Sequence, residues 1–148
     1  FRQALRMYNK TGKMGKEMGV AVCVHPHSHY GSLLETAEEY GRLMNETDPD
    51  SVLFGPDTGH IVRGRQNLLE TVRRHISRIR HIHFKDVDAQ GNWKPMGEGT
   101  CDFPAVLKLL EDSGYNGWVI LEEESEEARK DQFNAIKKNR DYIRSLGY

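Results

Sequence analysis

Four short apolar segments, spaced roughly thirty residues apart, limit the fold more than any other feature of this chain. They read VAVCV, SVLFG, RHIHF and WVILE, at residues 20–24, 51–55, 80–84 and 118–122. Each interval carries apolar residues at helical spacing, and such a strand–helix repeat predicts a parallel sheet with right-handed crossovers. Either an open doubly wound sheet or part of a (β/α)8 barrel fits this pattern. A whole barrel needs eight units and about 250 residues, so the 148 residues of this chain predict half a barrel in the second case.

The intervening helices are predicted from apolar spacing and from capping residues. Ser32, with Glu35 three residues later, predicts a capping box at the start of one helix. Asp102 and Gly114 predict the start and the end of another. The remaining helices are expected over residues 1–18, 68–79 and 133–146, and a loop is expected over residues 86–100.

Charge and cysteine content exclude several classes of protein. The 22 acidic and 21 basic residues nearly cancel, so no strong field favours nucleic acid or an acidic membrane surface. The sequence lacks a run of about 18 apolar residues and a leader-like start, so we expect neither a membrane span nor a secretory signal. Two cysteines, Cys23 and Cys101, are too few for a disulfide framework, so we expect one domain over residues 1–148 in the reducing cytoplasm.

Histidine and acidic side chains gather where the predicted strands end. In chain order they are His25, His27, His29, Asp57, His60, His81, His83 and Glu122. Because the carboxyl ends of parallel strands meet at one rim, we expect several of these side chains to converge. Each one alone has an ordinary interpretation as a solvated or hydrogen-bonded residue, but the shared strand register makes the joint pattern typical of a site. Mixed carboxylate and imidazole ligands without thiolates predict a divalent metal other than Ca²⁺.

Four segments carry a resemblance to a known family. HPHSH, FGPDTGH, HIHFKD, and GEGTCDF together with GYNGWVILE resemble the second half of xylose-isomerase-like sugar isomerase/epimerase barrels. The resemblance covers nearly the whole chain and implies strands five to eight of a (β/α)8 TIM barrel. It also implies that strands one to four come from elsewhere, so we expect an oligomer or a missing N-terminal half-barrel.

The same resemblance implies individual site residues. Asp57 of DTGH, His83 of HIH and Glu122 of VILE match the family's metal ligands, and His60 matches a residue that contacts substrate oxygens. The fourth ligand is commonly a glutamate at the end of strand five, where this chain has His25. In ketose 3-epimerases that glutamate and the strand-eight glutamate form the proton-transferring pair, so the change to histidine argues against simple two-base epimerisation.

The histidine cluster after the first strand and the segment HFKD look more like inosose (2-keto-myo-inositol) dehydratases and their relatives. That likeness implies that Lys85 and Asp86 lie at the rim near the substrate. Glu98, in the GEG loop, either helps to close the site or serves only as a turn residue.

Our hypothesis from the sequence is a metal-dependent reaction on a sugar or keto-polyol. Asp57, His83 and Glu122 hold the metal, Mn²⁺ or Co²⁺ by preference and Zn²⁺ or Mg²⁺ as alternatives, with His25 or His27 as a fourth ligand or base. The candidate catalytic residues are His25, His60 and Glu122, and the candidate substrate contacts are His27, His60, Lys85, Asp86 and Glu98. The cation stabilises the enediolate that forms when a base removes the proton next to the carbonyl. Loss of a β-hydroxyl then gives dehydration and reprotonation gives isomerisation or epimerisation, and the sequence leaves both outcomes open.

Two rival interpretations remain at this point. Type IV apurinic endonucleases share the barrel and a DxxH motif, but the balanced charge of this chain disfavours binding to DNA phosphate. A half-barrel without the other strands is the second rival, since it would be an incomplete site or an association module with open sheet edges. The aromatic residues Tyr30, Trp93 and Trp118 have either a packing role or a role in stacking on a sugar ring.

Overall fold

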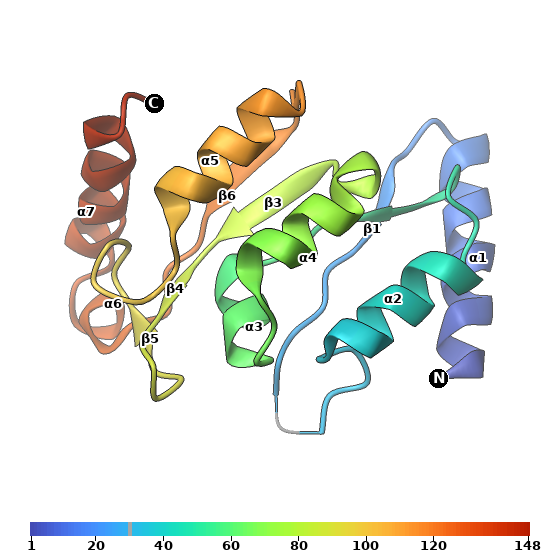
Figure 1. Ribbon diagram of the computed structural model, residues 1–148, viewed down its shortest axis with the longest axis horizontal. Coiled ribbons are helices and arrows are strands. Elements are labelled where there is room, and N and C mark those ends of the chain that lie inside the picture. The colour runs from blue at the N-terminus through green and yellow to red at the C-terminus, as the bar shows by residue number, and fades with distance from the viewer. Residues whose placement is uncertain (30) are drawn as a thin grey trace.

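The computed structural model of the chain describes residues 1–29 and 31–148 (Figure 1). The helices are α1 (Arg2–Glu17), α2 (Ala37–Glu46), α3 (Thr58–Arg63), α4 (Leu68–His75), the 3-10 turn η1 (Ile76–Arg78), α5 (Phe103–Asp112), α6 (Glu126–Lys130) and α7 (Gln132–Ser145). The strands are β1 (Val22–Val24), β2 (Val52–Phe54), β3 (His81–Phe84), β4 (Asp86–Val87), β5 (Trp93–Lys94) and β6 (Trp118–Leu121). Tyr30, a candidate for stacking on a sugar, lies outside the described residues.

The four predicted strands all form, and all of them run in the same direction. β1 pairs with β2 and β3 pairs with β6, both in parallel. Parallel bridges from Phe54 to Ile79 and from Asp57 to His83 connect β2 to β3, so the spatial order is β1-β2-β3-β6. The expectation of parallel strands alternating with helices is confirmed.

The two faces of this strand layer differ in burial. Ile82 and Phe84 of β3 are fully buried on the side of the layer where α4 and α5 lie in front of the strands in Figure 1. On the opposite face, His81 pairs in register with Trp118 and His83 pairs with Ile120. Trp118 is 79% exposed and Ile120 is 39% exposed, although both are large and apolar. In a closed barrel such a face lines the interior, so this layer presents a barrel interior that no described residue covers.

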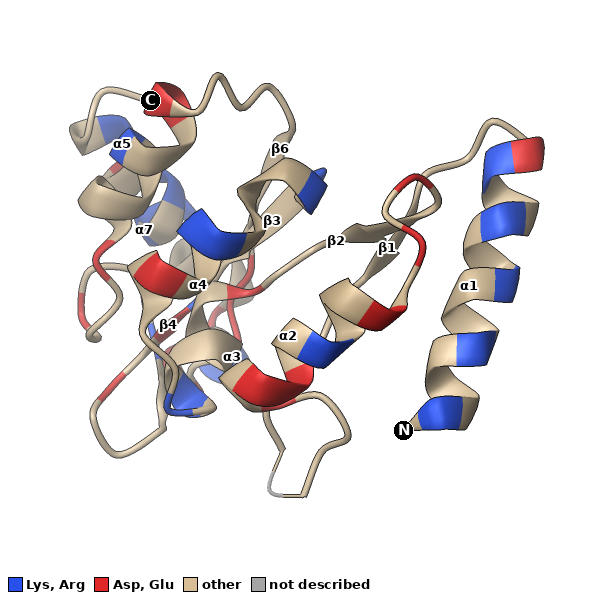
Figure 2. Ribbon diagram, turned by 45° about the vertical axis from the view of Figure 1, so that its right-hand side comes forward, with Lys and Arg blue, Asp and Glu red and all other residues tan. Residues whose placement is uncertain are grey.

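Helix α1 packs closely against the first two strands because it carries glycines on its inner side. A β-carbon at Gly12 would lie 2.6 Å from the carbonyl oxygen of Ser51, and one at Gly15 would lie 2.4 Å from a methyl group of Val22. The lysines and arginines of α1 recur along the length of the helix and are exposed (Figure 2). The two glycines thus permit close packing, although their low helix propensity weakens the helical pattern in the sequence.

The second predicted helix begins later than expected. Its N-cap is Thr36, whose side-chain oxygen accepts from the backbone N–H of Glu39 at 3.3 Å, while the Glu39 carboxylate accepts from the Thr36 N–H at 2.7 Å. The Ser32 hydroxyl instead accepts from the backbone N–H of His29 at 2.9 Å. Two overlapping capping-box patterns occur in this segment, and the second one forms, with Tyr40 and Leu43 on the buried side of the helix.

Other boundaries also differ from the expectations. The DTGH segment forms α3, so His60 lies in a helix, and the helix expected over residues 68–79 ends at His75 with a 3-10 turn after it. The last expected helix forms as α7, with the short helix α6 before it, and Phe133 is 78% exposed because Ala135 and Asn139 form the buried side of α7. Asp102 and the left-handed Gly114 bound α5 as predicted. The expected loop over residues 86–100 contains the antiparallel β4–β5 hairpin.

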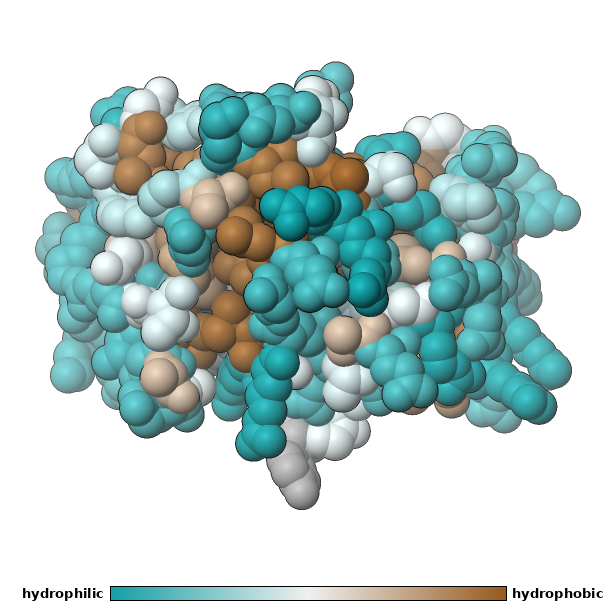
Figure 3. All heavy atoms as spheres, viewed as in Figure 1, coloured by the Kyte–Doolittle hydropathy of each residue, from teal (hydrophilic) through white to brown (hydrophobic). Residues whose placement is uncertain are grey.

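Most of the surface on the helical side of the chain is hydrophilic. In Figure 3 the apolar side chains that reach the surface gather in the middle of that side, and both ends are mostly hydrophilic. Within the described part of the chain, no helix combines the length and the apolar character needed to cross a membrane.

Candidate metal centre

Four side chains from the ends of four neighbouring strands converge at one edge of the sheet. Each of His25, Asp57, His83 and Glu122 offers a ligand atom, and these atoms all lie within 4.8 Å of one another. His25 follows β1, Asp57 is the N-cap of α3 after β2, His83 belongs to β3, and Glu122 follows β6. The Glu122 N–H donates to the Phe84 carbonyl at 3.0 Å, which continues the β3–β6 pairing as far as the site. The backbone pairing of the strands therefore brings these four side chains together.

Asp57 is the most deeply buried member of this set, with no exposed surface. Its Oδ1 accepts from the backbone N–H of His60 at 2.8 Å, whereas its buried Oδ2 lacks a hydrogen-bond partner among the described residues. Burial raises the pKa of this carboxyl to about 7, despite the hydrogen bond from His60. A buried carboxylate oxygen without a partner is costly unless a cation binds it, so this atom fits the place of a metal ligand.

Glu122 and His83 are hydrogen-bonded to each other. The Glu122 Oε2 lies 2.7 Å from the His83 Nδ1, and its Oε1 accepts from the Lys85 ammonium at 2.7 Å. Burial alone would raise the pKa of Glu122, but the hydrogen bonds from Lys85 and His83 lower it to about 2. Glu122 is therefore ionised at neutral pH, which suits a ligand and makes it a weak base for proton transfer.

His25 presents one ring nitrogen to the site in a defined tautomer. Its Nδ1 lies 2.8 Å from the Gly55 carbonyl oxygen, and a carbonyl only accepts, so Nδ1 carries the proton. The lone pair is then on Nε2, as in metal-binding histidines whose other ring nitrogen donates to a backbone carbonyl. Burial also lowers the pKa of His25, which favours the neutral form that binds metals.

The donor set fits a divalent cation. It combines two imidazoles with two carboxylates, contains no thiolate, and includes one carboxylate oxygen that has no hydrogen-bond partner in the described part of the chain. Such ligands suit Mn²⁺, Co²⁺, Zn²⁺ or Fe²⁺.

His60 lies beside this centre as a neutral hydrogen-bond donor. Its Nδ1 accepts from the backbone N–H of Ser28 at 2.9 Å, which leaves the proton on Nε2. Burial, together with the nearby Lys85 charge, lowers the pKa of His60 to about 3. The ring stacks on His27 with centroids 4.4 Å apart and meets the edge of Trp93 at 4.9 Å. A buried imidazole in this state can donate a hydrogen bond from Nε2 and is a poor general base.

Comparison with known proteins places the chain in a family. A family model described as "Xylose isomerase-like TIM barrel" matches residues 1–146. The chain belongs to this family. It is 35% identical to an inosose dehydratase of Geobacillus thermodenitrificans over 92% of its own length and 51% of that protein. It is 33% identical to an inosose dehydratase of Erwinia tasmaniensis over 97% of its own length and 54% of that protein. The chain thus spans about half the length of the curated relatives it matches.

Solved structures show the same fold at lower sequence identity. The IOLI protein with a binding zinc atom superposes with a TM-score of 0.80 at 19% identity, over 98% of this chain and 55% of that one. A D-psicose 3-epimerase with D-tagatose, from Clostridium cellulolyticum, superposes with a TM-score of 0.76 at 18% identity, over 99% of this chain and 55% of that one. The resemblance to xylose isomerase-like barrels is therefore confirmed.

Two of the predicted rim residues have buried positions in this xylose isomerase-like chain. Lys85 is 1% exposed, and its ammonium group lies 2.7 Å from Glu122 and 2.9 Å from Glu124. The Asp86 carboxylate accepts from the backbone N–H groups of Gly97 and Gly99 at 2.9 Å each, and further backbone bonds come from Val87 and Cys101. Four N–H groups of its own loop thus occupy the oxygens of Asp86, and its place near a substrate stays a prediction.

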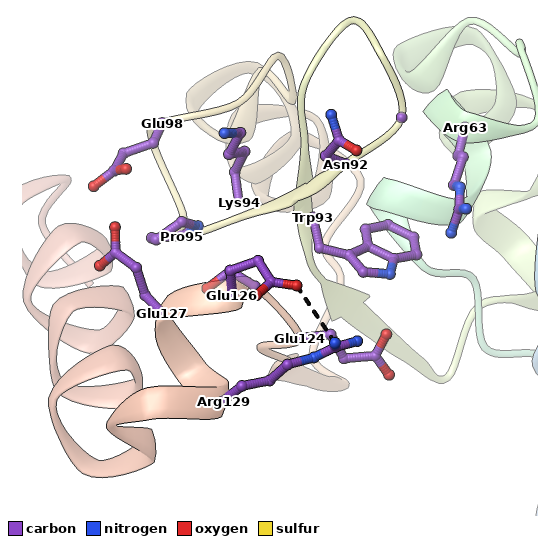
Figure 4. A pocket seen from close by; sticks show the side chains of 12 residues that line it. Arg63, Asn92, Trp93, Lys94, Pro95, Glu98, Glu124, Glu126, Glu127 and Arg129 are labelled. Carbon is purple, nitrogen blue, oxygen red and sulfur yellow. Dashed lines mark ion pairs between the residues drawn. The ribbon is translucent and has the colours of Figure 1, made fainter.

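An open hollow of about 520 Å³ lies between the β4–β5 hairpin and the segment that follows β6. Trp93, Glu98 and Glu124 help to line it, with Arg63 facing the indole of Trp93 in Figure 4. The Arg63 guanidinium lies 4.7 Å from the Trp93 ring centroid, and the Lys85 ammonium lies 4.3 Å from it. Trp93 therefore belongs to the wall of the hollow, whereas Trp118, the other aromatic candidate, lies at the opposite end of β6 from Glu122.

Sequence reasoning missed the residues that hold this site in place. Ser28 fixes the tautomer of His60, and Glu124 holds the second side of Lys85. Asn139 of α7 joins two loops, since its Oδ1 accepts from the Met96 N–H at 2.9 Å and its Nδ2 donates to Glu123 at 2.8 Å. The helix also carries Asn134, which is exposed, so an asparagine in this sequence gives no signal for such a role.

Proposed function

We propose that the chain is strands five to eight of a (β/α)8 barrel that carries out a metal-dependent dehydration of a keto-polyol. One observation carries this proposal. His25, Asp57, His83 and Glu122 bring four ligand atoms within 4.8 Å of one another, and Asp57 Oδ2 has no hydrogen-bond partner within residues 1–29 and 31–148. The curated relatives named inosose dehydratase favour dehydration of an inosose-like substrate.

The proposed roles follow from the protonation state of each group. Asp57, His83, Glu122 and the Nε2 of His25 hold the cation, with Mn²⁺ or Co²⁺ preferred. A bound divalent cation supplies Lewis-acid polarisation of the substrate carbonyl. His60 donates its Nε2–H to a substrate oxygen, because its Nδ1 is occupied by Ser28.

The base is assigned to His27. Its ring is exposed beside His60, at a centroid distance of 4.4 Å, and 4.7 Å from the ring of His25. Imidazole is the side chain best suited to proton transfer near neutral pH. His27 removes the proton next to the carbonyl and returns it to the departing β-hydroxyl, so the C–O bond breaks, water leaves and an α,β-unsaturated ketone remains.

The Lys85 ammonium and the polar hollow supply orientation. Lys85 fixes one oxygen of Glu122 so that the other remains directed at His83 and the centre. Glu98 and Glu124 face the hollow, where carboxylates suit the hydroxyl groups of a polyol. Manganese as the resident ion and inositol-derived ketones as substrates are both part of the proposal.

The test is an assay of the metal-loaded protein in D₂O with keto-inositols and ketoses, followed by mass spectrometry. Loss of one water from a keto-inositol supports dehydration, whereas deuterium uptake without loss of water identifies isomerisation or epimerisation. Asp57→Asn and Glu122→Gln are expected to abolish turnover, and Asp112→Asn and Glu111→Gln, exposed carboxylates on or beside α5, serve as matched controls. Full activity in metal-free protein would contradict the proposal.

A second candidate is an incomplete module that acts only with a complementary half. The exposed Trp118 and Ile120 on the barrel-interior face favour it. Native mass and metal content separate the two: one metal per completed barrel supports the enzyme, and a metal-free monomer supports the incomplete module.

A further inference from the structure

A second cluster of three imidazoles lies on the barrel-interior face, beside the mixed-ligand centre. His25, His81 and His83 each offer a ring nitrogen, and these nitrogens lie within 4.8 Å of one another. The ring centroids of His25 and His83 are 4.2 Å apart, and those of His81 and His83 are 5.2 Å apart. His81 has no part in the proposed dehydration, so its place in this cluster needs a separate explanation.

Strand geometry explains why His81 and His83 act together. Residues two apart in a strand point to the same face, so the His-x-His pair of β3 directs both rings toward the barrel interior. The third imidazole comes from the end of β1, a strand separated from β3 by β2. Three histidines with an open fourth position are an established arrangement for zinc in proteins.

Gly55, directly after β2, makes the meeting of these rings possible. A β-carbon at this position would lie 2.2 Å from the His81 Nε2, so any larger residue would displace that ring. The Gly55 carbonyl also accepts from the His25 Nδ1 at 2.8 Å, which leaves Nε2 of His25 as the ligand atom. One residue therefore provides space for His81 and orients His25.

We propose that His25, His81 and His83 form a second, all-imidazole cation site that binds Zn²⁺ or another ion with affinity for nitrogen ligands. The inference goes beyond the proposed dehydration and does not depend on it. Imidazole ligands suit Zn²⁺, Cu²⁺ and Ni²⁺, whereas carboxylate-containing sites accept Mn²⁺ and Mg²⁺. His25 and His83 belong to both sites, so a cation on the three imidazoles removes two ligands from the mixed centre. Excess Zn²⁺ is therefore expected to displace Mn²⁺ from the protein.

The first experiment measures retained zinc by elemental analysis after dialysis of the protein against limiting Zn²⁺. The double variant Asp57→Asn/Glu122→Gln, which lacks the carboxylate ligands, is expected to keep about one zinc ion per chain. Adding His81→Gln or Gly55→Ala to it is expected to abolish that zinc. His29→Gln is the matched control, because His29 is an exposed histidine near the same strand end that is outside the cluster.

The second experiment needs only single variants, so it tests the proposal even if the double variant does not fold. Pulsed electron paramagnetic resonance of the Cu²⁺-loaded protein counts coordinated imidazoles. Three are expected in the wild type and in His29→Gln, and two in His81→Gln.

Zinc retention that is independent of His81, or a Cu²⁺ signal that His81→Gln does not change, would overturn the proposal. Either result with Mn²⁺ binding intact would leave the proposed dehydratase centre standing, so the two failures are distinguishable.

Discussion

Asp57 and His83 are partners in a parallel β-bridge, so two of the four candidate ligands are neighbours through the backbone itself. The His83 N–H donates to the carbonyl of Pro56 at 2.8 Å, directly before Asp57. The same aspartate caps α3 by accepting from the His60 N–H. Strand register and helix start therefore fix Asp57, His60 and His83 together, which preorganises the site without a long loop.

Replacement of Asp57 by asparagine is expected to separate metal binding from stability. The folded-state pKa of Asp57 is raised to about 7, so its contribution favours folding at low pH and is lost as the pH rises from about 4 through 7. Above pH 7 the metal-free protein carries a buried charge, and Asp57→Asn is expected to stabilise it by on the order of 2 kcal/mol. Asparagine also retains the N-cap oxygen. Urea unfolding at pH 8 in EDTA measures the change.

The same variant is expected to lose the rise in melting temperature that Mn²⁺ gives the wild type, because ligand binding stabilises only a site that holds the ligand. Asp112→Asn should keep that rise. An Asp57→Asn protein that is less stable than wild type in EDTA at pH 8 would show that Asp57 has a buried cationic partner instead.

Because His75 is buried in its neutral form, we expect the metal-free protein to lose stability in mild acid. Burial, with help from Arg74 and Arg78, lowers its folded-state pKa to about 4, against about 6.5 in the unfolded chain. Its stabilising contribution is present above pH 6.5 and is lost as the pH falls toward 4, by on the order of 2 kcal/mol. His75→Gln should flatten this part of the stability curve in EDTA.

The difference in free energy of unfolding between wild type and His75→Gln, taken at each pH, measures the contribution of this histidine alone. Asp57 changes the stability with pH in the opposite direction, but it does so equally in both proteins. Parallel curves for the two proteins between pH 4 and 6.5 would rule out a neutral, buried His75.

Asn139 is expected to hold two rim loops in place from α7. Asn139→Ala leaves the Met96 N–H and the Glu123 carboxylate without their partner, at a cost of about 1–3 kcal/mol. Hydrogen exchange should then accelerate over residues 95–99 and 123–125. Asn134→Ala, on the exposed side of the same helix, should change stability by less than about 0.5 kcal/mol. Equal effects of the two variants would contradict this role.

Trp118 is expected to mediate association of the strand layer. It is 79% exposed on β6, a strand that pairs on one side only among the described residues, and exposed apolar edges favour pairing with another sheet. Trp118→Lys should lower the sedimentation coefficient of the protein at micromolar concentration. Phe133→Lys, which alters an equally exposed residue on the outer helix α7, should leave it unchanged. A wild-type protein that sediments as a monomer at every concentration would exclude this association.

The sequence was sufficient to predict the four parallel strands and the convergence of residues at their ends, because both depend on strand periodicity. The start of α2 was not predictable from capping residues alone. Ser32 and Thr36 carry the same local pattern, with a glutamate three residues later in each case, so the pattern does not say which of them starts the helix. The hydrogen bonds that Asp86 accepts from its own loop were also not predictable from the sequence. A strand-end aspartate that binds a loop and one that faces a substrate have the same sequence pattern.

Anomalous X-ray diffraction from crystals soaked in Mn²⁺ tests the central claim most directly. We predict one anomalous peak at about 2.0–2.2 Å from Nε2 of His25, Oδ2 of Asp57, a ring nitrogen of His83 and a carboxylate oxygen of Glu122. The peak should disappear in Asp57→Asn crystals. An ion bound elsewhere, or the four side chains too far apart to share one ion, would contradict the account.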